Sequence, residues 1–299
     1  MNAVEGIVPP MITPLLDDDK LDYKGIEKLT EHLISGGVNG LFILGTTGEG
    51  PSLEFSLKLD LIKRVCNQVN GRIPVLVGII DSSYKESIYL SNESEKLGAQ
   101  SVVLTTPFYY QIDQLELYNF TEQLIREISL PVYLYNNPGL TKVYYETDTL
   151  RKLLLMPEII GLKDSSGNMV YFNHLLKLTE EFDRSLLMGP EELFVESLLM
   201  GANGGVPGGA NIFPELFVEI YDLFNSGDLK KARDLHNKVM KLSEIVYSSN
   251  GYGSSNVISG IKCALAYLDI CNDYVAKPLS KVNSDKAKRI KKYLSGNRL

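Results

Sequence analysis

Cysteine and histidine are scarce in this sequence, with three of each among 299 residues. The cysteines form no close pairing motif, so they do not build a disulfide scaffold: Cys66, Cys263 and Cys271. The histidines are too scattered along the chain to suggest a metal cage: His32, His174 and His236. We therefore expect neither structural disulfides nor a bound metal.

Long apolar runs and an excess of basic residues are also missing. No window approaches the roughly 18 uninterrupted apolar residues of a membrane span, and the first residues lack the pattern of a secretory signal. The 30 basic and 37 acidic residues give a net charge of -7, which does not indicate a nucleic-acid surface. Each cysteine lies among apolar neighbours and is interpreted as a buried small hydrophobe. These features predict a cytoplasmic protein that binds neither membranes nor nucleic acids.

The composition that remains is close to that of an average globular protein, with 44% hydrophobic and 22% charged residues. The length allows two domains, or one large barrel with an addition. Eight short apolar runs alternate with longer helical segments, and each spacing is about one strand plus one helix. The runs begin near Ile7, Gly40, Pro74, Ser101, Pro131, Ile159, Ser185 and Gly204.

The middle runs, such as Leu41 to Leu44, are apolar throughout, which is typical of parallel strands buried on both faces. The fold predicted is a (β/α)8 TIM barrel over residues 1–225, followed by a C-terminal helical extension over residues 226–299. The alternative is an open doubly wound sheet, but no Gly-x-Gly-x-x-Gly turn follows the first strand. Helices are expected from Leu229 to Tyr247, Val257 to Leu268 and Asp285 to Leu294.

Active sites of such barrels form at the carboxyl ends of the strands, so candidate residues are sought there. The second strand ends in a turn from Gly45 to Gly50, whose two threonines and amides suit a carboxylate or phosphate, although it could be an ordinary polar turn. The fourth strand ends near Tyr109 and the fifth carries Tyr135. Taken singly, these tyrosines are as expected of core residues.

The sixth strand carries Lys163 directly after a run of apolar and glycine positions. Burial disfavours the ammonium form, so such an amine can act as a nucleophile and form a Schiff base with a ketone. An ion pair with Asp164 is the structural alternative. Adjacent strand residues point to opposite faces, however, so the two side chains are not expected to meet.

These motifs together resemble the dihydrodipicolinate synthase and N-acetylneuraminate lyase family of pyruvate-dependent class I aldolases. The resemblance covers the chain from the segment Pro9 to Pro14 to the C-terminal helices. It is carried by the Gly45-Thr46-Thr47-Gly48-Glu49 turn, the Tyr135-Asn136-x-Pro138 motif and the Gly161-x-Lys163 strand. The fold implied is the same barrel.

The resemblance also implies catalytic roles. Lys163 would form the Schiff base with pyruvate, and Tyr135 would be the general acid and base. Thr46 would link Tyr135 to Tyr109, which in many relatives reaches in from the neighbouring subunit. Neither a metal nor a cofactor is implied, because the covalent imine at Lys163 is the electron sink. Relatives are often tetramers, so a homo-oligomer built as a dimer of dimers is expected.

Substrate-binding residues follow from the same resemblance. Thr46 and Thr47 would hold the pyruvate carboxylate, and Gly205 and Val206 would position the substrate with backbone carbonyls. Leu140 stands where synthases carry an arginine for a second carboxylate, which disfavours aspartate semialdehyde as the aldehyde. The remaining candidates resemble residues of sialic acid lyases and 2-keto-3-deoxy sugar acid aldolases: Ser165, Gly189, Glu191 and Glu192. Gly208 departs from the serine that sialic acid lyases carry there.

The function expected is a Schiff-base-forming class I aldolase or lyase. It would join pyruvate to an aldehyde or cleave a 2-oxo-3-deoxy sugar acid of the sialic acid or 2-keto-3-deoxygluconate type. One alternative is 4-hydroxy-tetrahydrodipicolinate synthase of lysine biosynthesis, and another is an inactive relative that binds pyruvate or a sugar acid for regulation. A third is a barrel enzyme that binds phosphate through Gly204 to Gly209.

Overall fold

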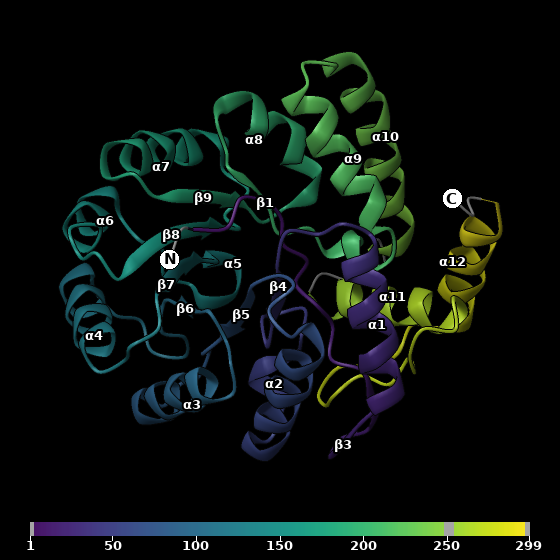
Figure 1. Cartoon of the computed structure of the whole chain (residues 1–299), viewed down its shortest axis with the longest axis horizontal. Coiled ribbons are helices and arrows are strands. Elements are labelled where there is room, and N and C mark those ends of the chain that lie inside the picture. Colours follow the sequence, from purple (N-terminus) through teal and green to yellow (C-terminus); the bar gives the residue numbers. More distant parts are fainter. Residues whose placement is uncertain (1–2, 248–253, 297–299) are drawn as a thin grey trace.

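A computed structural model describes residues 3–247 and 254–296 of the chain. Eight parallel strands are hydrogen-bonded in the order β1-β10-β9-β8-β7-β6-β5-β4. Beyond β1, Pro10 forms a parallel bridge with Phe42 of β4, so the first and last strands of this order also meet. The sheet is therefore a closed barrel, with its helices arranged around it (Figure 1). The predicted (β/α)8 barrel is confirmed.

The barrel strands begin at or within two residues of the expected positions. Their bounds are β1 (Gly6–Ile7), β4 (Leu41–Ile43), β5 (Val75–Gly78), β6 (Ser101–Thr105), β7 (Val132–Asn136), β8 (Ile159–Asp164), β9 (Ser185–Met188) and β10 (Gly204–Gly205). A two-stranded antiparallel hairpin, β2 (Leu15–Asp17) with β3 (Lys20–Leu21), was not expected from the sequence.

Helices follow the strands and cover the barrel. Those of the barrel region are α1 (Tyr23–Ser35), α2 (Phe55–Val69), α3 (Tyr84–Lys96), α4 (Gln114–Arg126), α5 (Pro138–Thr141), α6 (Thr147–Leu153), α7 (Met169–Phe182), α8 (Phe194–Met200) and α9 (Pro214–Asn225). Side chains cap their starts: Asp22 accepts from Gly25 N at 3.0 Å, and Ser83 accepts from Glu86 N at 3.3 Å. Asp22 and Ser83 are thus the N-caps of α1 and α3.

Three further helices follow the barrel: α10 (Leu229–Val246), α11 (Ser254–Tyr267) and α12 (Ser284–Gly296). Helix α10 packs beside α9, and α11 packs against both α10 and α12 (Figure 1). The helices lie where the sequence predicts them, and α9 ends at Asn225. The proposed division into a barrel (1–225) and an extension (226–299) is compatible with these bounds, although residues 248–253 and 297–299 lie outside the described part.

Apolar side chains fill two regions of the barrel. The interior cluster includes Phe42, Leu76, Val103, Tyr133 and Leu187, which are all at most 2% exposed. The larger cluster lies between the strands and the surrounding helices. Within residues 3–247 and 254–296, no helix is long and apolar enough to cross a membrane. In the same ranges, no group of histidine, cysteine and acidic side chains could hold a metal ion.

Candidate active site

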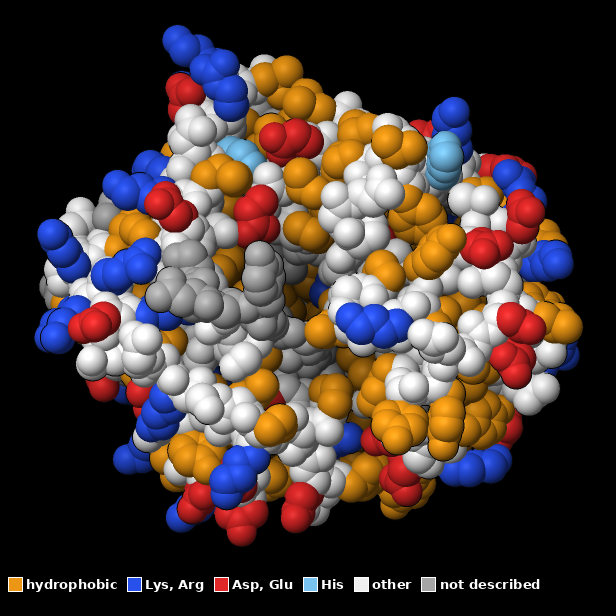
Figure 2. Space-filling model, turned by 180° about the vertical axis from the view of Figure 1, so that it is seen from behind, with side chains coloured by type: hydrophobic (Ala, Val, Ile, Leu, Met, Phe, Trp, Pro, Cys, Tyr) orange, Lys and Arg blue, Asp and Glu red, His pale blue; other side chains and the backbone are white. Residues whose placement is uncertain are grey.

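A cavity of about 270 Å³ opens where the barrel strands end. The space-filling view from behind shows a hollow near the centre of that face (Figure 2). Residues from β7, β8 and the loops after β4, β9 and β10 share its wall with residues of the C-terminal extension. Lys163 and Tyr135 line this cavity. Eight other residues predicted from the sequence line it as well: Thr46, Thr47, Leu140, Ser165, Gly189, Glu191, Glu192 and Val206.

Lys163 lies on β8, in register with Tyr135 on β7. Its Nζ is 4.0 Å from the centre of the Tyr135 ring and 5.0 Å from that of Phe42. The residue is 7% exposed, and burial lowers the pKa of its amine. A larger share of the amine is therefore neutral, and nucleophilic, than in an exposed lysine.

Asp164 does not pair with Lys163. Its carboxylate accepts hydrogen bonds from Asn136 Nδ2 and Ser166 Oγ, both at 2.7 Å. The Asp164 carboxylate is therefore bound by Asn136 and Ser166 and not by the Lys163 amine. This agrees with the expectation that the two neighbours face opposite sides of the strand. A structural ion pair therefore does not explain the buried lysine.

Tyr135 is 3% exposed, and its hydroxyl accepts a hydrogen bond from Asn137 Nδ2 at 3.0 Å. The Ser165 hydroxyl donates to the same oxygen at 3.4 Å. Burial alone would raise the pKa of Tyr135, but the Lys163 ammonium and hydrogen bonds that include one from Thr46 bring its pKa below the ordinary value. The phenol is thus placed to exchange a proton with a group at Lys163 Nζ.

The turn from Gly45 to Gly50 brings Thr46 and Thr47 to the cavity wall. It is tight: a Cβ added at Gly50 would lie 2.1 Å from the Leu44 carbonyl oxygen. Leu44 and Glu49, with φ of 56° and 58°, adopt the left-handed conformation. For residues other than glycine this conformation costs roughly 1–2 kcal/mol each, so contacts elsewhere must hold the turn.

Glu191 lines the cavity but is only 4% exposed. Its two carboxylate oxygens accept hydrogen bonds from Gly209 N at 2.6 Å and Tyr247 Oη at 2.9 Å. Burial, with a smaller contribution from the charge of Glu192, raises the pKa of Glu191 to about 8. Its oxygens are therefore already engaged by the protein, whereas the half-buried Glu192 carboxylate contacts Ser243 through one oxygen.

Two of the predicted residues lie outside the cavity lining. The Gly205 carbonyl accepts a hydrogen bond from Val8 N at 2.9 Å, as part of the contact that joins β10 to β1. Tyr109 is 87% exposed and packs edge-to-face against Tyr110. Neither Tyr109 nor Tyr110 lines the cavity.

Seven further lining residues were not assigned to the site from the sequence: Pro10, Asn137, Pro190, Gly208, Tyr247, Val257 and Ile258. Asn137 stands inside the Tyr135 motif, so its position in that motif could have indicated it. Tyr247 directly follows α10, and Val257 and Ile258 lie on α11. Apolar and aromatic side chains there carry no sequence signal that separates them from core residues.

No cysteine lines the cavity, and the glycine-rich loop contributes only Val206 and Gly208 to its described wall. All three cysteines are free thiols, and burial raises the pKa of both Cys66 and Cys271 to about 12. Such thiols are poor nucleophiles near neutral pH. In the loop from Gly204 to Gly209, the Gly209 amide already donates to a carboxylate. That contact argues against the phosphate-binding alternative.

Known proteins of one family are similar to this chain over nearly its whole length. The model of the dihydrodipicolinate synthetase family matches residues 3–297. A solved dihydrodipicolinate synthase from Bacteroides thetaiotaomicron superposes with a TM-score of 0.94 at 45% identity, over 99% of this chain and 100% of that one. A 4-hydroxy-tetrahydrodipicolinate synthase of Archaeoglobus fulgidus is 30% identical over 290 residues, 97% of either chain.

A relative that is named for a different activity is about as similar to this chain as the Archaeoglobus fulgidus synthase. A probable 2-dehydro-3-deoxy-D-pentonate aldolase of Escherichia coli is 32% identical over 248 residues, 82% of either chain. Synthases and sugar acid aldolases are therefore both among the relatives. The chain belongs to the dihydrodipicolinate synthetase family of pyruvate-dependent lyases.

Proposed function

We propose that Lys163 forms an imine with pyruvate and that the chain makes or cleaves a carbon–carbon bond through it. The observation that carries this proposal is the position of the buried Lys163 Nζ, 4.0 Å from the centre of the Tyr135 ring, on the wall of the cavity at the strand ends. A nucleophilic amine, a phenol that can carry a proton and two threonines converge there. That set suits a small 2-oxo acid.

The reaction follows from these groups. The neutral Lys163 amine adds to the ketone carbon, and loss of water, aided by proton transfer through Tyr135, leaves a protonated imine. Loss of a methyl proton gives an enamine, which attacks the carbon of an aldehyde. Water then hydrolyses the imine and releases the product, while cleavage runs the same steps in reverse. The imine is the electron sink, so we propose no cofactor beyond this covalent bond.

The pyruvate carboxylate is assigned to Thr46 and Thr47. Both line the cavity, and their turn presents hydroxyl and amide donors. The turn lies at the end of β4, near enough to Tyr135 for the Thr46 hydroxyl to lower the pKa of Tyr135. A carboxylate held there would place the adjoining ketone toward Lys163.

We assign the aldehyde to an uncharged, hydroxyl-bearing class, which makes the product a 2-oxo-3-deoxy sugar acid. Among the described lining residues, Lys163 is the only lysine or arginine, and Leu140 occupies the site where a second carboxylate would need a counter-ion. Glu192, Asn137 and Tyr247 offer partners for hydroxyl groups. The Escherichia coli pentonate aldolase, 32% identical, supports this class.

The second candidate is 4-hydroxy-tetrahydrodipicolinate synthase. It is favoured by the 45% identity with the Bacteroides thetaiotaomicron synthase and disfavoured by Leu140. An inactive binding relative is disfavoured, because Lys163 and Tyr135 are both present and meet in the cavity.

We further propose that the chain works as a homo-oligomer in which Tyr109 completes the site of a partner subunit. In its own chain Tyr109 is exposed, with φ of 84°. A second cavity of about 230 Å³ lies beside Thr46 and Phe108 and offers room for an aromatic ring. We place this oligomer, built as a dimer of dimers, in the cytoplasm, where the three free thiols would stay reduced.

Borohydride trapping tests the central claim. Incubation with pyruvate and borohydride should add one reduced pyruvate per chain, and peptide mapping should place it on Lys163. An adduct on another lysine, or none, would overturn the mechanism. A panel of aldehydes with pyruvate, read by product mass, then separates the candidates: hydroxylated aldehydes should turn over well and aspartate semialdehyde poorly.

A further inference from the structure

The turn that carries Thr46 and Thr47 must be stabilised by contacts with residues outside it. Glu49 follows them with φ of 58° and ψ of 22°, in the left-handed region. An ordinary side chain disfavours that conformation, which persists only where the surroundings fix it. Backbone hydrogen bonds and Thr13 Oγ1, which donates to the Gly48 carbonyl at 2.6 Å, hold part of the turn, and the contacts of the Glu49 side chain add to them.

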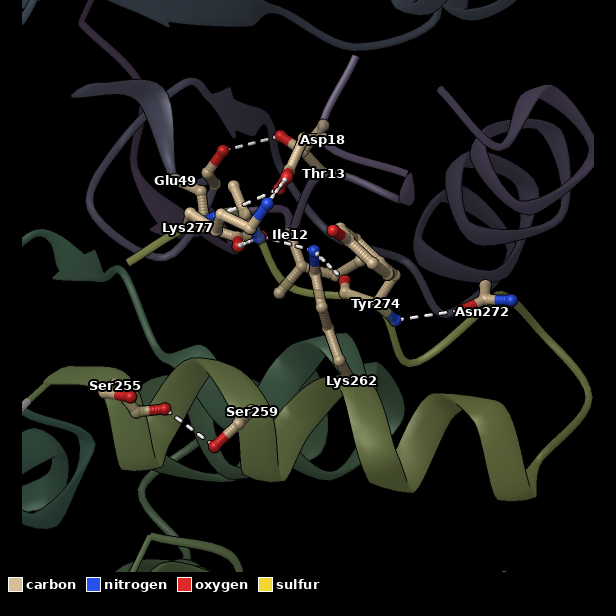
Figure 3. A network of polar contacts seen from close by, with 12 residues as sticks. Ile12, Thr13, Asp18, Glu49, Ser255, Ser259, Lys262, Asn272, Tyr274 and Lys277 are labelled. Carbon is tan, nitrogen blue, oxygen red and sulfur yellow. Dashed lines mark hydrogen bonds and ion pairs between the residues drawn. The ribbon is translucent and has the colours of Figure 1, made fainter. Parts of the chain in front are cut away.

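The Glu49 side chain is buried and reaches the C-terminal extension. Its carboxylate forms an ion pair with Lys262 of α11, and neither side chain has any exposed surface. Oxygen Oε1 also accepts a hydrogen bond from Ala276 N at 2.7 Å. Lys262 extends from α11 and donates to the Tyr274 carbonyl at 2.7 Å (Figure 3). One carboxylate thus ties the turn to a helix and to the loop after it.

The same helix forms part of the cavity wall. Val257 and Ile258 of α11 line the cavity at the strand ends, and Ile258 also lines the second cavity, of about 230 Å³, together with Thr46. Lys262 follows Ile258 by four residues, so the two side chains lie on one face of the helix. The ion pair therefore joins the wall that carries the two threonines to the wall formed by α11.

The ion pair between Glu49 and Lys262 is not explained well by a contribution to the stability of the fold. A buried ion pair often contributes no more than an apolar pair of the same shape, because both charges lose their hydration. Burial accordingly raises the pKa of Glu49 and lowers that of Lys262. What the pair does supply is a fixed geometry at a strained turn.

We propose that Glu49 and Lys262 are positioning residues that hold the Thr46–Thr47 turn in the conformation that binds the carboxylate of the 2-oxo acid. This inference rests on the proposed function, since it assumes that pyruvate binds at that turn. The two residues act through the turn and through α11 and do not touch the substrate. Their loss should weaken pyruvate binding more than the later chemical steps.

The test uses the full-length protein and three variants: Glu49→Gln, Lys262→Met and the double variant. For each, the pyruvate concentration that gives half-maximal borohydride trapping is measured, together with the melting temperature. We expect this concentration to rise at least about tenfold, since a small misplacement of a positioning group can cost on the order of a hundredfold. At saturating pyruvate, the adduct should still reach one per chain on Lys163.

Two variants on α12 serve as controls. Lys286→Met removes another buried lysine, whose Nζ donates to the Asn256 carbonyl at 3.1 Å, and Ile290→Ala opens a gap in the apolar core. Both should lower the melting temperature and leave the half-saturating pyruvate concentration unchanged. If the half-saturating pyruvate concentration rises as much in Ile290→Ala as in the double variant, the proposal is overturned, because destabilisation alone would then explain the weaker binding of pyruvate.

Each single variant leaves one buried charge without its partner and could fail to fold for that reason. The double variant removes both charges, so it can still be tested in that case. A folded double variant with wild-type half-saturation would overturn the proposal. So would failure of all three variants to fold, which would assign the pair a structural role. Absence of trapping in the wild-type protein at any pyruvate concentration would instead refute the proposed function, so the two failures are distinguishable.

Discussion

Tyr135 and Lys163 are register partners on neighbouring parallel strands, and the Lys163 Nζ lies 4.0 Å from the centre of the Tyr135 ring. The ladder between β7 and β8 sets the two backbones side by side, and both side chains are buried there. An amine and a phenol held together in a buried cavity can pass a proton between them as an imine forms.

Lys163→Met should abolish turnover and remove the borohydride adduct, because no amine remains to attack the ketone. The variant should also be more stable, since methionine keeps the buried stem and removes a charge that burial disfavours. A gain of 1 kcal/mol corresponds to a rise in melting temperature of about 2–4 °C in a domain of 150–250 residues. A lower melting temperature, measured by calorimetry, would contradict the second expectation.

Tyr135→Phe should lower kcat by about 10²–10⁴-fold, the usual contribution of a general acid or base. The ring keeps its packing against Phe42 in this variant, so the fold should be retained. Steady-state kinetics with pyruvate and a hydroxylated aldehyde checks the loss. Tyr133→Phe is the matched control, because the Tyr133 hydroxyl accepts a hydrogen bond from Val4 N at 2.5 Å and does not line the cavity at the strand ends. A comparable loss in the control would remove the catalytic role from Tyr135.

Glu191 should make stability depend on pH. Its pKa is about 8 in the folded chain against an ordinary value of 4.5, so the folded state binds the extra proton between these values. The stability that this proton contributes is complete below about pH 4.5 and is lost as the pH rises through about 8. The loss should be on the order of a few kcal/mol.

Melting temperatures measured from pH 5 to pH 9 test this linkage. The wild-type protein should lose stability across the range, whereas Glu191→Gln should lose less and be the more stable form at the alkaline end. Glu215→Gln, at the exposed start of α9, is the control and should follow the wild-type curve. Parallel curves for wild-type protein and Glu191→Gln would refute the raised pKa of this carboxyl.

Leu140→Arg should shift the choice of aldehyde toward one with its own carboxylate. A hydrogen bond to a charged group contributes about 1.5–3 kcal/mol, which corresponds to roughly a tenfold to hundredfold gain in kcat/KM for aspartate semialdehyde. Leu140→Gln has a similar length and no charge, so it should show no such gain. If the wild-type protein already turns over aspartate semialdehyde as well as hydroxylated aldehydes, the assignment to sugar acids is wrong.

Mixed oligomers test the role proposed for Tyr109. Lys163→Met and Tyr109→Phe should each have low activity alone, whereas a hybrid dimer contains one site with both residues intact. Random mixing by unfolding and refolding should therefore restore up to about a quarter of wild-type activity. No recovery in a mixture shown by mass spectrometry to contain hybrids would mean that Tyr109 does not act across subunits.

Much of the fold could be predicted because it is encoded locally. Continuous apolar runs such as Leu41 to Leu44 and their spacing determine parallel strands and crossover helices, and a polar residue such as Asp22 marks a helix start. The hairpin β2–β3 escaped prediction, because its short strands are mostly exposed and form no continuous apolar run.

By itself, the sequence determined the barrel and the presence of a lysine in an apolar strand, because periodicity and burial are properties of consecutive residues. Only the tertiary structure decided which distant groups share the cavity. Glu191 is engaged by Gly209 and Tyr247, and Lys262 reaches back to Glu49 over more than two hundred positions of sequence. Such pairings depend on closure of the barrel and packing of α11, which no local pattern records.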